Sequence, residues 1–319
     1  YYNPEIIEGF EAKYDVDVKM IEIATYKELF EALDSENKPD LVITGELIFP
    51  KLINEGYLEP LNKSLIPNIK NIDPLFKGLS FDPNNEYSLP YHYLTLGLIY
   101  DKKELDKSEV TLQNYFEAPA KFEGDLTTYP NKRFMVGMAL KYLGYSANNL
   151  NDENMELVKM VLESLEANII EKGSDVTNRD IYAGYRELLA DEADIAVSYA
   201  ANSVVRTFKA QDKIGIKIPA EGGIVGTDDM AVVKDADNME MAHKFINYYY
   251  EPEIAAKSIE YLGNAFPVKG VKEYLPKELV NDPTIFPPMK VVKNLEFPVP
   301  LTDEETAKYH KAWDSVFGE

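Results

Sequence analysis

The first part of the chain alternates helical and strand-like hydrophobic patterns. Residues 4–14 carry apolar side chains at helical spacing, and residues 16–23 alternate apolar and polar side chains as a strand does. A capped helix over 25–33 follows, then a short apolar strand at 40–44 and a helix over 47–55. Strands that alternate with helices predict an α/β fold, with a mostly parallel sheet covered by helices.

Length and composition narrow the class of protein further. A chain of 319 residues exceeds the size at which one hydrophobic core is comfortable, so two domains are expected. Hydrophobic residues at 45% and charged residues at 28% are typical of a globular protein, and no apolar run is long enough to cross a membrane. With no cysteine, thiolate metal sites, cysteine catalysis and disulfides are excluded. The net charge of −22 argues against binding nucleic acid or an anionic lipid surface.

The segment 218–233 concentrates glycines and carboxylates between two strand-like runs. Glycines at 222, 223 and 226 permit a tight reversal, or a close approach of the backbone to a ligand. Asp228 and Asp229 then stand at the start of an apolar strand. This pattern fits two interpretations: a hairpin with a solvated acidic tip, or a turn that lies beside a bound ligand.

Several motifs resemble one known family. The segment EGGIVGTD is similar to the EGG-I-x-x-x-D signature of the spermidine/putrescine-binding proteins of polyamine ABC transporters. The loop sequence LNKSLIPNIKNIDPLFKGLSFDPNNEYSLPY resembles the family's long connecting passage in nearly the same register. Further similar stretches extend the resemblance over essentially the whole chain, at residues 138–149, 244–255 and 281–288.

The resemblance implies a two-lobed periplasmic-binding-protein fold of type II. The expected lobes are residues 1–94 with 227–271, and residues 95–226 with 272–319. The ligand would lie in a cleft between the lobes, and the crossing strands would act as the hinge. The family carries a further strand upstream of the first residue here, so we expect a trimmed or partly ordered chain whose export signal has been removed.

The resemblance also implies a set of binding residues. Asp228 stands where the family keeps its central cleft aspartate, and Tyr199 stands where the family has a tryptophan wall. Tyr2, Tyr91 and Tyr93 align with other aromatic contacts, although each could equally be ordinary packing.

Other positions depart from the family pattern. Asn131 and Phe134 replace an acidic pair that holds an amine, Asn202 replaces an aspartate of some members, and Asn264 replaces a tyrosine. Because each lost carboxylate weakens the pairing of an ammonium, Asp229 and Glu46 are candidates for compensating charge, with Glu46 equally explained as a carboxylate at a helix start.

The function expected from these residues is that of a solute receptor for an ABC importer of the polyamine class. The sequence lacks H-E-x-x-H, G-x-S-x-G and phosphate-loop motifs, which predicts no enzyme, no metal site and no cofactor. The alternatives are a receptor for another small polar solute, such as an amino acid, a sugar or a ferric ion, and an enzyme or interaction-only surface protein. Ferric ion would need tyrosinates, for which residues 248–250 offer a run of three tyrosines.

The expected partners follow from the same resemblance. The receptor would bind a small-molecule ligand and present it to a membrane permease powered by an ATPase, with no nucleic acid partner. We expect a monomer at the periplasmic or extracellular face of the membrane, held by a lipid anchor if the source is Gram-positive.

Overall fold

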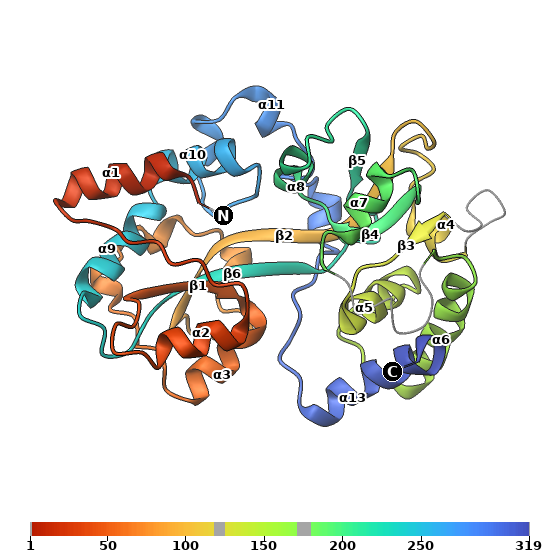
Figure 1. Ribbon diagram of the computed structural model, residues 1–319, viewed down its shortest axis with the longest axis horizontal. Coiled ribbons are helices and arrows are strands. Elements are labelled where there is room, and N and C mark those ends of the chain that lie inside the picture. Colours follow the sequence, from red (N-terminus) through yellow and green to blue (C-terminus); the bar gives the residue numbers. More distant parts are fainter. Residues whose placement is uncertain (1, 118–124, 171–179, 319) are drawn as a thin grey trace. The chain divides into compact units, whose positions relative to one another are not determined.

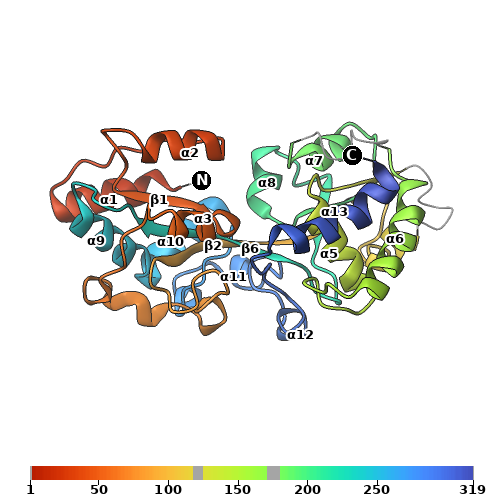
Figure 2. The ribbon, with the colours of Figure 1, turned by 90° about the horizontal axis from the view of Figure 1, so that it is seen from below.

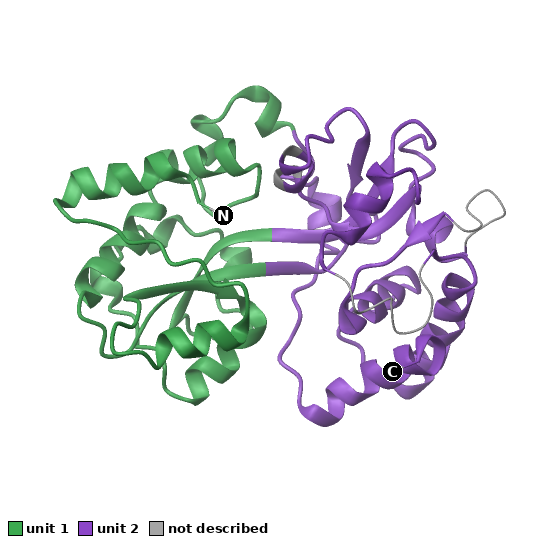
Figure 3. Ribbon diagram, viewed as in Figure 1, with its two compact units in different colours: residues 1–93, 227–281 green, residues 94–226, 282–319 purple. Residues whose placement is uncertain are grey.

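The computed structural model describes residues 2–117, 125–170 and 180–318, without the side chains of residues 202, 203 and 206. The chain divides into two compact units (Figure 3). Unit 1 consists of residues 1–93 and 227–281, and unit 2 consists of residues 94–226 and 282–319.

The last passage between the units differs from the expected boundary at residue 271. The turn η7 (Val271–Glu273) packs against helix α10 (Pro252–Leu262), and the Val271 side chain is buried. Residues 272–281 therefore belong to unit 1, and the chain enters unit 2 only at Asp282.

A pair of strands forms the centre of unit 1. Strand β1 (Leu41–Gly45) pairs antiparallel with β6 (Val225–Val232), in a register that joins Leu41 to Val232 and Gly45 to Asp228 (Figure 1). Residues of α2 (Tyr26–Leu33), β1, α3 (Phe49–Asn54) and β6 share one hydrophobic core. The helices of this unit are α1 (Pro4–Tyr14), α2 (Tyr26–Leu33), α3 (Phe49–Asn54), α9 (Met239–Tyr249), α10 and α11 (Lys277–Val280), with short 3-10 turns at η1 (Glu46–Ile48), η2 (Lys63–Leu65), η3 (Pro67–Asn71), η4 (Pro74–Phe76) and η7.

The first two helices begin where their capping residues predict. The Asn3 side chain accepts a hydrogen bond from the backbone of Glu5, and proline occupies the first helical position of α1. Thr25 and Glu28 form a reciprocal capping box at the start of α2. Local side-chain chemistry is sufficient for these boundaries, so both predictions are confirmed.

The prediction of a strand at residues 16–23 is wrong. This segment is not part of any strand pairing among the described residues, and the Val18 N–H donates to the Glu11 carboxylate at 2.8 Å. An alternating pattern suits a pleated surface, but a strand also requires a neighbour for its backbone hydrogen bonds.

The sheet pairs in unit 2 are mainly antiparallel. Strand β2 (Ser88–Asp101) begins in unit 1, and its second half pairs antiparallel with both β4 (Ile195–Tyr199) and β5 (Ile214–Lys217). Only β3 (Leu126–Thr127) pairs in parallel, with β4, among the strand pairs described in the two units. The mostly parallel sheet expected from the βα alternation is therefore wrong, because strands distant in the sequence become neighbours without the crossover that parallel neighbours need.

The main core of unit 2 lies beneath its longest helices. Helix α13 (Asp303–Phe317) packs against α5 (Lys132–Tyr142) and α6 (Asp152–Glu166), as Figure 2 shows. The only tryptophan of the chain, Trp313, is fully buried in this core and stacks on Phe317 with ring centroids 4.1 Å apart. The other helices in the described part of unit 2 are α4 (Leu112–Glu117), α7 (Ala183–Leu189), α8 (Asn202–Thr207) and α12 (Met289–Val292).

Candidate functional site

Three carboxyl groups of unit 1 lie near the end of β1, where this strand pairs with β6. Asp228 and Asp229 are successive residues of β6, opposite Gly45 and Thr44 of β1. Because successive strand residues point to opposite faces, the two aspartates differ in burial: the Asp228 side chain is 23% exposed, whereas Asp229 is 1% exposed. Glu46, which follows β1 directly, is 7% exposed. The structure therefore brings together the three acidic residues that the sequence nominated.

One threonine connects the two buried carboxyl groups. The Thr227 N–H donates to Glu46 Oε2 at 2.9 Å, and the Thr227 hydroxyl donates to Asp229 Oδ2 at 2.7 Å. Sequence reasoning missed Thr227, although a hydroxyl beside two aspartates is a signal that could have been used. The contact with Glu46 spans 181 positions in the chain, which no local pattern reveals.

Burial shifts the acidity of both groups in the same direction. Burial raises the pKa of Glu46 to about 8, and the negative charges of Asp229 and Asp228 add to the rise. Burial also raises the pKa of Asp229 to about 7, partly opposed by the hydrogen bond from Thr227. At neutral pH this cluster therefore retains protons that exposed carboxylates would have lost.

A histidine that the sequence analysis did not nominate lies beside Asp228. His92 Nδ1 is 3.4 Å from Asp228 Oδ2, and the His92 side chain is 2% exposed. Burial lowers the pKa of His92, although the charge of Asp228 acts in the opposite direction. The imidazole is thus neutral at neutral pH and supplies no full positive charge to Asp228. His92 lies on β2 between the nominated Tyr91 and Tyr93, and this position is the signal that could have identified it.

A third missed residue is Tyr26, at the start of α2. Burial raises the pKa of its hydroxyl, and the charges of Glu46 and Asp228 add to the rise. The ring is nevertheless half exposed over its surface. Tyr26 therefore offers an aromatic face close to the carboxyl cluster, on the same unit.

The nominated tyrosines of β2 are engaged in packing. Tyr91 is buried and makes edge contacts with Tyr249 and Phe266, at ring-centroid distances of 5.2 and 5.1 Å. Tyr93 lies 4.3 Å from the Phe76 ring, and its N–H donates to the Ala265 carbonyl at 3.0 Å. Burial raises the pKa of the Tyr93 hydroxyl well above its ordinary value. The ligand-binding role of both tyrosines stays a prediction.

Two further nominated residues also belong to unit 1. Asn264 is buried in the loop after α10, next to the Ala265 that pairs with Tyr93. Tyr2 is half-buried just before α1.

The tyrosine run 248–250 lies at the end of α9. Burial raises the pKa of Tyr249 to about 12, and the buried Tyr250 hydroxyl donates to the Pro90 carbonyl at 2.6 Å. Tyrosinates are therefore disfavoured here. No group of three or more histidine, aspartate or glutamate residues in the described parts of the chain is arranged to hold a metal ion.

The nominated residues of unit 2 form a separate group. Tyr199 ends β4 and meets Tyr129 edge-on at a centroid distance of 5.3 Å, while Tyr129 stacks on the buried Phe134 at 6.1 Å. Asn131 caps α5 by accepting a hydrogen bond from the Phe134 N–H at 3.0 Å. Asn202 begins α8, and its side chain lies outside the described parts of the structure. Tyr129 was missed, because only the tertiary structure places it between two nominated residues.

Two glycines of the 218–233 segment, Gly222 and Gly223, allow close approach of other parts of the backbone. Gly222 has φ +96°, and a side chain there would meet the carbonyl group of Asn294. A side chain at Gly223 would meet the Leu96 carbonyl oxygen. Both glycines therefore permit close packing inside unit 2, and this packing explains them without a ligand.

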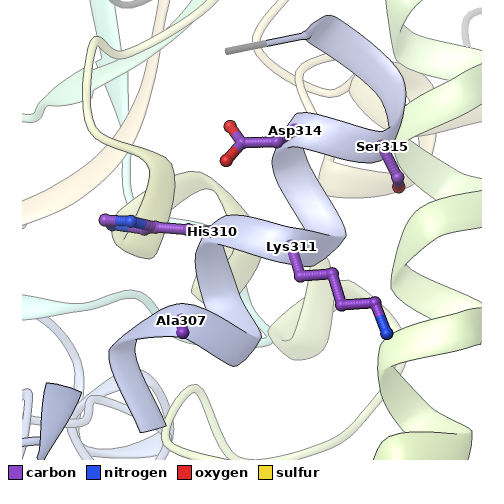
Figure 4. Close-up of a pocket in the computed structure, with 5 residues that line it drawn as sticks. All are labelled: Ala307, His310, Lys311, Asp314 and Ser315. Carbon is purple, nitrogen blue, oxygen red and sulfur yellow. The ribbon is translucent and has the colours of Figure 1, made fainter. Parts of the chain in front are cut away.

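The described residues that line a surface hollow on unit 2 all belong to one helix. Figure 4 shows that their side chains project from α13. None of these residues was nominated for ligand binding. The lining residues are Ala307, His310, Lys311, Asp314 and Ser315.

Among the described residues, no helix combines the length and the apolar character that crossing a membrane requires.

Comparison with known proteins identifies the class. Residues 5–287 match the bacterial extracellular solute-binding protein family, and because this is most of the chain, the protein belongs to that family. The spermidine/putrescine-binding periplasmic protein of Escherichia coli is 27% identical over 299 residues, which cover 93% of this chain and 83% of that protein. The putrescine/cadaverine-binding protein of Pseudomonas aeruginosa is 23% identical over 282 residues, or 87% of this chain and 79% of that protein.

A solved structure supports the same assignment. The spermidine/putrescine substrate-binding protein PotD of Streptococcus pneumoniae superposes with a TM-score of 0.89 at 25% identity, covering 99% of this chain and 95% of that one. The predicted family resemblance and the predicted two-lobed periplasmic-binding-protein fold are both confirmed, and the protein is a solute-binding receptor by family.

Proposed function

We propose that this chain is the receptor of an ABC importer for a polyamine-class solute, with Asp228 as the principal partner of a ligand ammonium. The observation that carries the proposal is the arrangement around Asp228. Of the three clustered carboxyl groups it is the least buried, and the imidazole beside it is neutral. A carboxylate without a full countercharge can pair with an incoming ammonium group.

Charge and aromatic surface agree with such a ligand. The relatives named for spermidine, putrescine and cadaverine bind flexible organic cations, and this chain carries a net charge of −22. Tyr26 offers a ring near Asp228, suited to the methylene groups or the ammonium of a polyamine. On unit 2, Tyr199 remains a candidate for a further aromatic contact.

The proposal includes the partners of an importer receptor. The protein acts outside the cytoplasmic membrane as a monomer that delivers its solute to a permease, and in a Gram-positive source a lipid anchor holds it there. It performs no catalysis and requires no cofactor or metal ion. Hinge motion on ligand binding is the output that the permease detects.

A second candidate is a receptor for a small polar solute with a single cationic group. This is favoured by the two unit 2 positions that replace the family's acidic pair. The Asn131 side-chain oxygen accepts the capping hydrogen bond of α5, and Phe134 is buried. Neither residue supplies a carboxylate for a second ammonium.

A thermal-shift screen against putrescine, spermidine, amino acids and sugars tests the proposal. A ligand at about a hundred times its dissociation constant stabilises the folded protein by about 2.7 kcal/mol, which is readily measured as a higher melting temperature. A shift with putrescine or spermidine supports the polyamine receptor. A shift with amino acids alone supports the second candidate, and a response to neither class contradicts both.

A further inference from the structure

The carboxyl groups of Glu46 and Asp229 form a buried pair in unit 1. They share Thr227 as a hydrogen-bond partner, which donates its N–H to one and its hydroxyl to the other. Among the described residues, neither forms an ion pair with a lysine or arginine. A carboxylate buried without a countercharge is strongly disfavoured, so each group is stabilised by holding a proton.

The groups that face this pair supply no positive charge that would favour its ionised form. His92 of β2 and Asp228 of β6 lie next to each other, with the imidazole neutral at neutral pH. Tyr26 of α2 and Tyr250 after α9 are kept in their neutral forms by burial, and Asp82 adds a negative charge near Asp229. The surroundings of the pair from all these elements are therefore neutral or negative.

We propose that an ammonium ligand bound at Asp228 displaces a proton from the Glu46–Asp229 pair, so that unit 1 exchanges a proton for the positive charge of its ligand. This inference rests on the proposed function and names a regulation of the same site. The exchange is balanced in charge and atoms: the bound ammonium retains its own protons, one carboxyl group becomes a carboxylate, and its proton passes to the buffer.

The direction follows from electrostatics. A nearby positive charge favours the ionised form of a carboxyl group, so the pair loses protons more readily in the complex than in the unliganded protein. Linkage requires the reciprocal effect: the ligand binds more tightly as the pH rises and the pair is already ionised. For each proton released, the binding constant rises about tenfold per pH unit. An acidic environment would therefore weaken capture of the solute.

Calorimetric titration of the intact protein with putrescine tests the exchange. Putrescine is the suitable probe because its primary amines, like the amine of lysine with a pKa near 10.4, stay protonated around neutral pH. The titration is performed at about pH 7 in two buffers of different ionisation enthalpy, phosphate and Tris. A released proton is taken up by the buffer, so the measured enthalpy should differ between the two buffers by an amount proportional to the protons released.

Variants locate the source of the proton. Glu46→Gln and Asp229→Asn each remove one titrating group and keep a similar shape, and each should reduce proton release. Glu8→Gln, on the exposed face of α1, is the matched control and should release as much as the original protein. If one variant fails to fold, the other variant, measured in the same two buffers, still shows whether the pair releases the proton.

The outcomes separate this inference from the proposed function. A binding enthalpy that becomes more exothermic in the buffer of larger ionisation enthalpy supports proton release, and the opposite dependence, which indicates proton uptake, overturns it. Binding with the same enthalpy in both buffers overturns the exchange and leaves the polyamine receptor intact. No binding of putrescine or spermidine at any pH overturns both.

Discussion

The two units present different chemistry at the positions nominated for ligand binding. In unit 1, three carboxyl groups, a neutral histidine and a partly exposed tyrosine lie within one short region of β1, β6, β2 and α2. In unit 2, the nominated Tyr199 and Phe134 form an aromatic group with Tyr129, and two polar atoms of nominated residues are used by the fold itself. The Tyr199 carbonyl accepts a hydrogen bond from the Tyr185 hydroxyl at 2.7 Å, and the Asn131 oxygen caps α5.

This difference suggests a division of labour. A carboxylate pairs with an ammonium group through charge, whereas aromatic faces mainly contribute contact area and weaker cation–π attraction. We therefore expect unit 1 to select the charge of the ligand and unit 2 to contribute less to affinity.

The largest effect is expected for Asp228→Asn. This change keeps the shape of the side chain and removes its charge, so affinity for a cationic ligand should fall by about 2–5 kcal/mol. The melting temperature of the unliganded protein should change little, because the side chain is partly exposed. Calorimetric titration measures the loss, and Asp237→Asn, at an exposed position of the same unit, is the control. Undiminished affinity would assign the charge pairing to Asp229 or Glu46, or indicate a neutral ligand.

Glu46 of unit 1 should make the stability of the unliganded protein depend on pH. The pKa of Glu46 is raised from 4.5 to about 8, so its protonated form is favoured by folding. Its contribution is complete below the unfolded value of 4.5 and is lost as the pH rises through about 8. Between about pH 5 and pH 8, the melting temperature of the unliganded protein should fall more steeply than that of Glu46→Gln. If the melting temperatures of the two proteins change equally with pH across this range, ionisation of Glu46 does not lower the stability of the folded protein.

Truncation of the unit 2 aromatic group should have a smaller effect on binding. Tyr199→Ala should reduce affinity by about 1 kcal/mol, the scale of a single aromatic or cation–π contact. Tyr199→Phe retains the ring and should bind almost as well. A loss as large as that of Asp228→Asn would refute the proposed division between the units.

The smallest effect on ligand affinity is expected for Tyr185→Phe, which tests the structural role of the same region. The variant removes the hydrogen bond to the Tyr199 carbonyl and should lower the free energy of unfolding by about 0.5–1.5 kcal/mol. Denaturant unfolding measures this change, and affinity for the ligand should be unaltered. If affinity falls instead of stability, the Tyr199 backbone is positioned for the ligand and not only for the fold.

The sequence by itself determined the features that depend on local chemistry. The Asn3–Pro4 start of α1 and the Thr25–Glu28 capping box lie within one turn of the helices they begin, so short motifs suffice to predict them. Resemblance identified the family and the fold and nominated Asp228, which Asp229 follows directly in the chain.

Only the tertiary structure decided the features that depend on distant partners. Residues 16–23 have the pattern of a strand but no strand partner among the described residues, and residues 272–281 join unit 1 because the turn at Val271 packs on α10. His92, Tyr26 and Thr227 enter the candidate site through contacts with residues far away in the sequence. Glu46 could be nominated from its position, but its retained proton follows from burial beside two other carboxyl groups, because the cost of ionisation is set by the surrounding dielectric and charges.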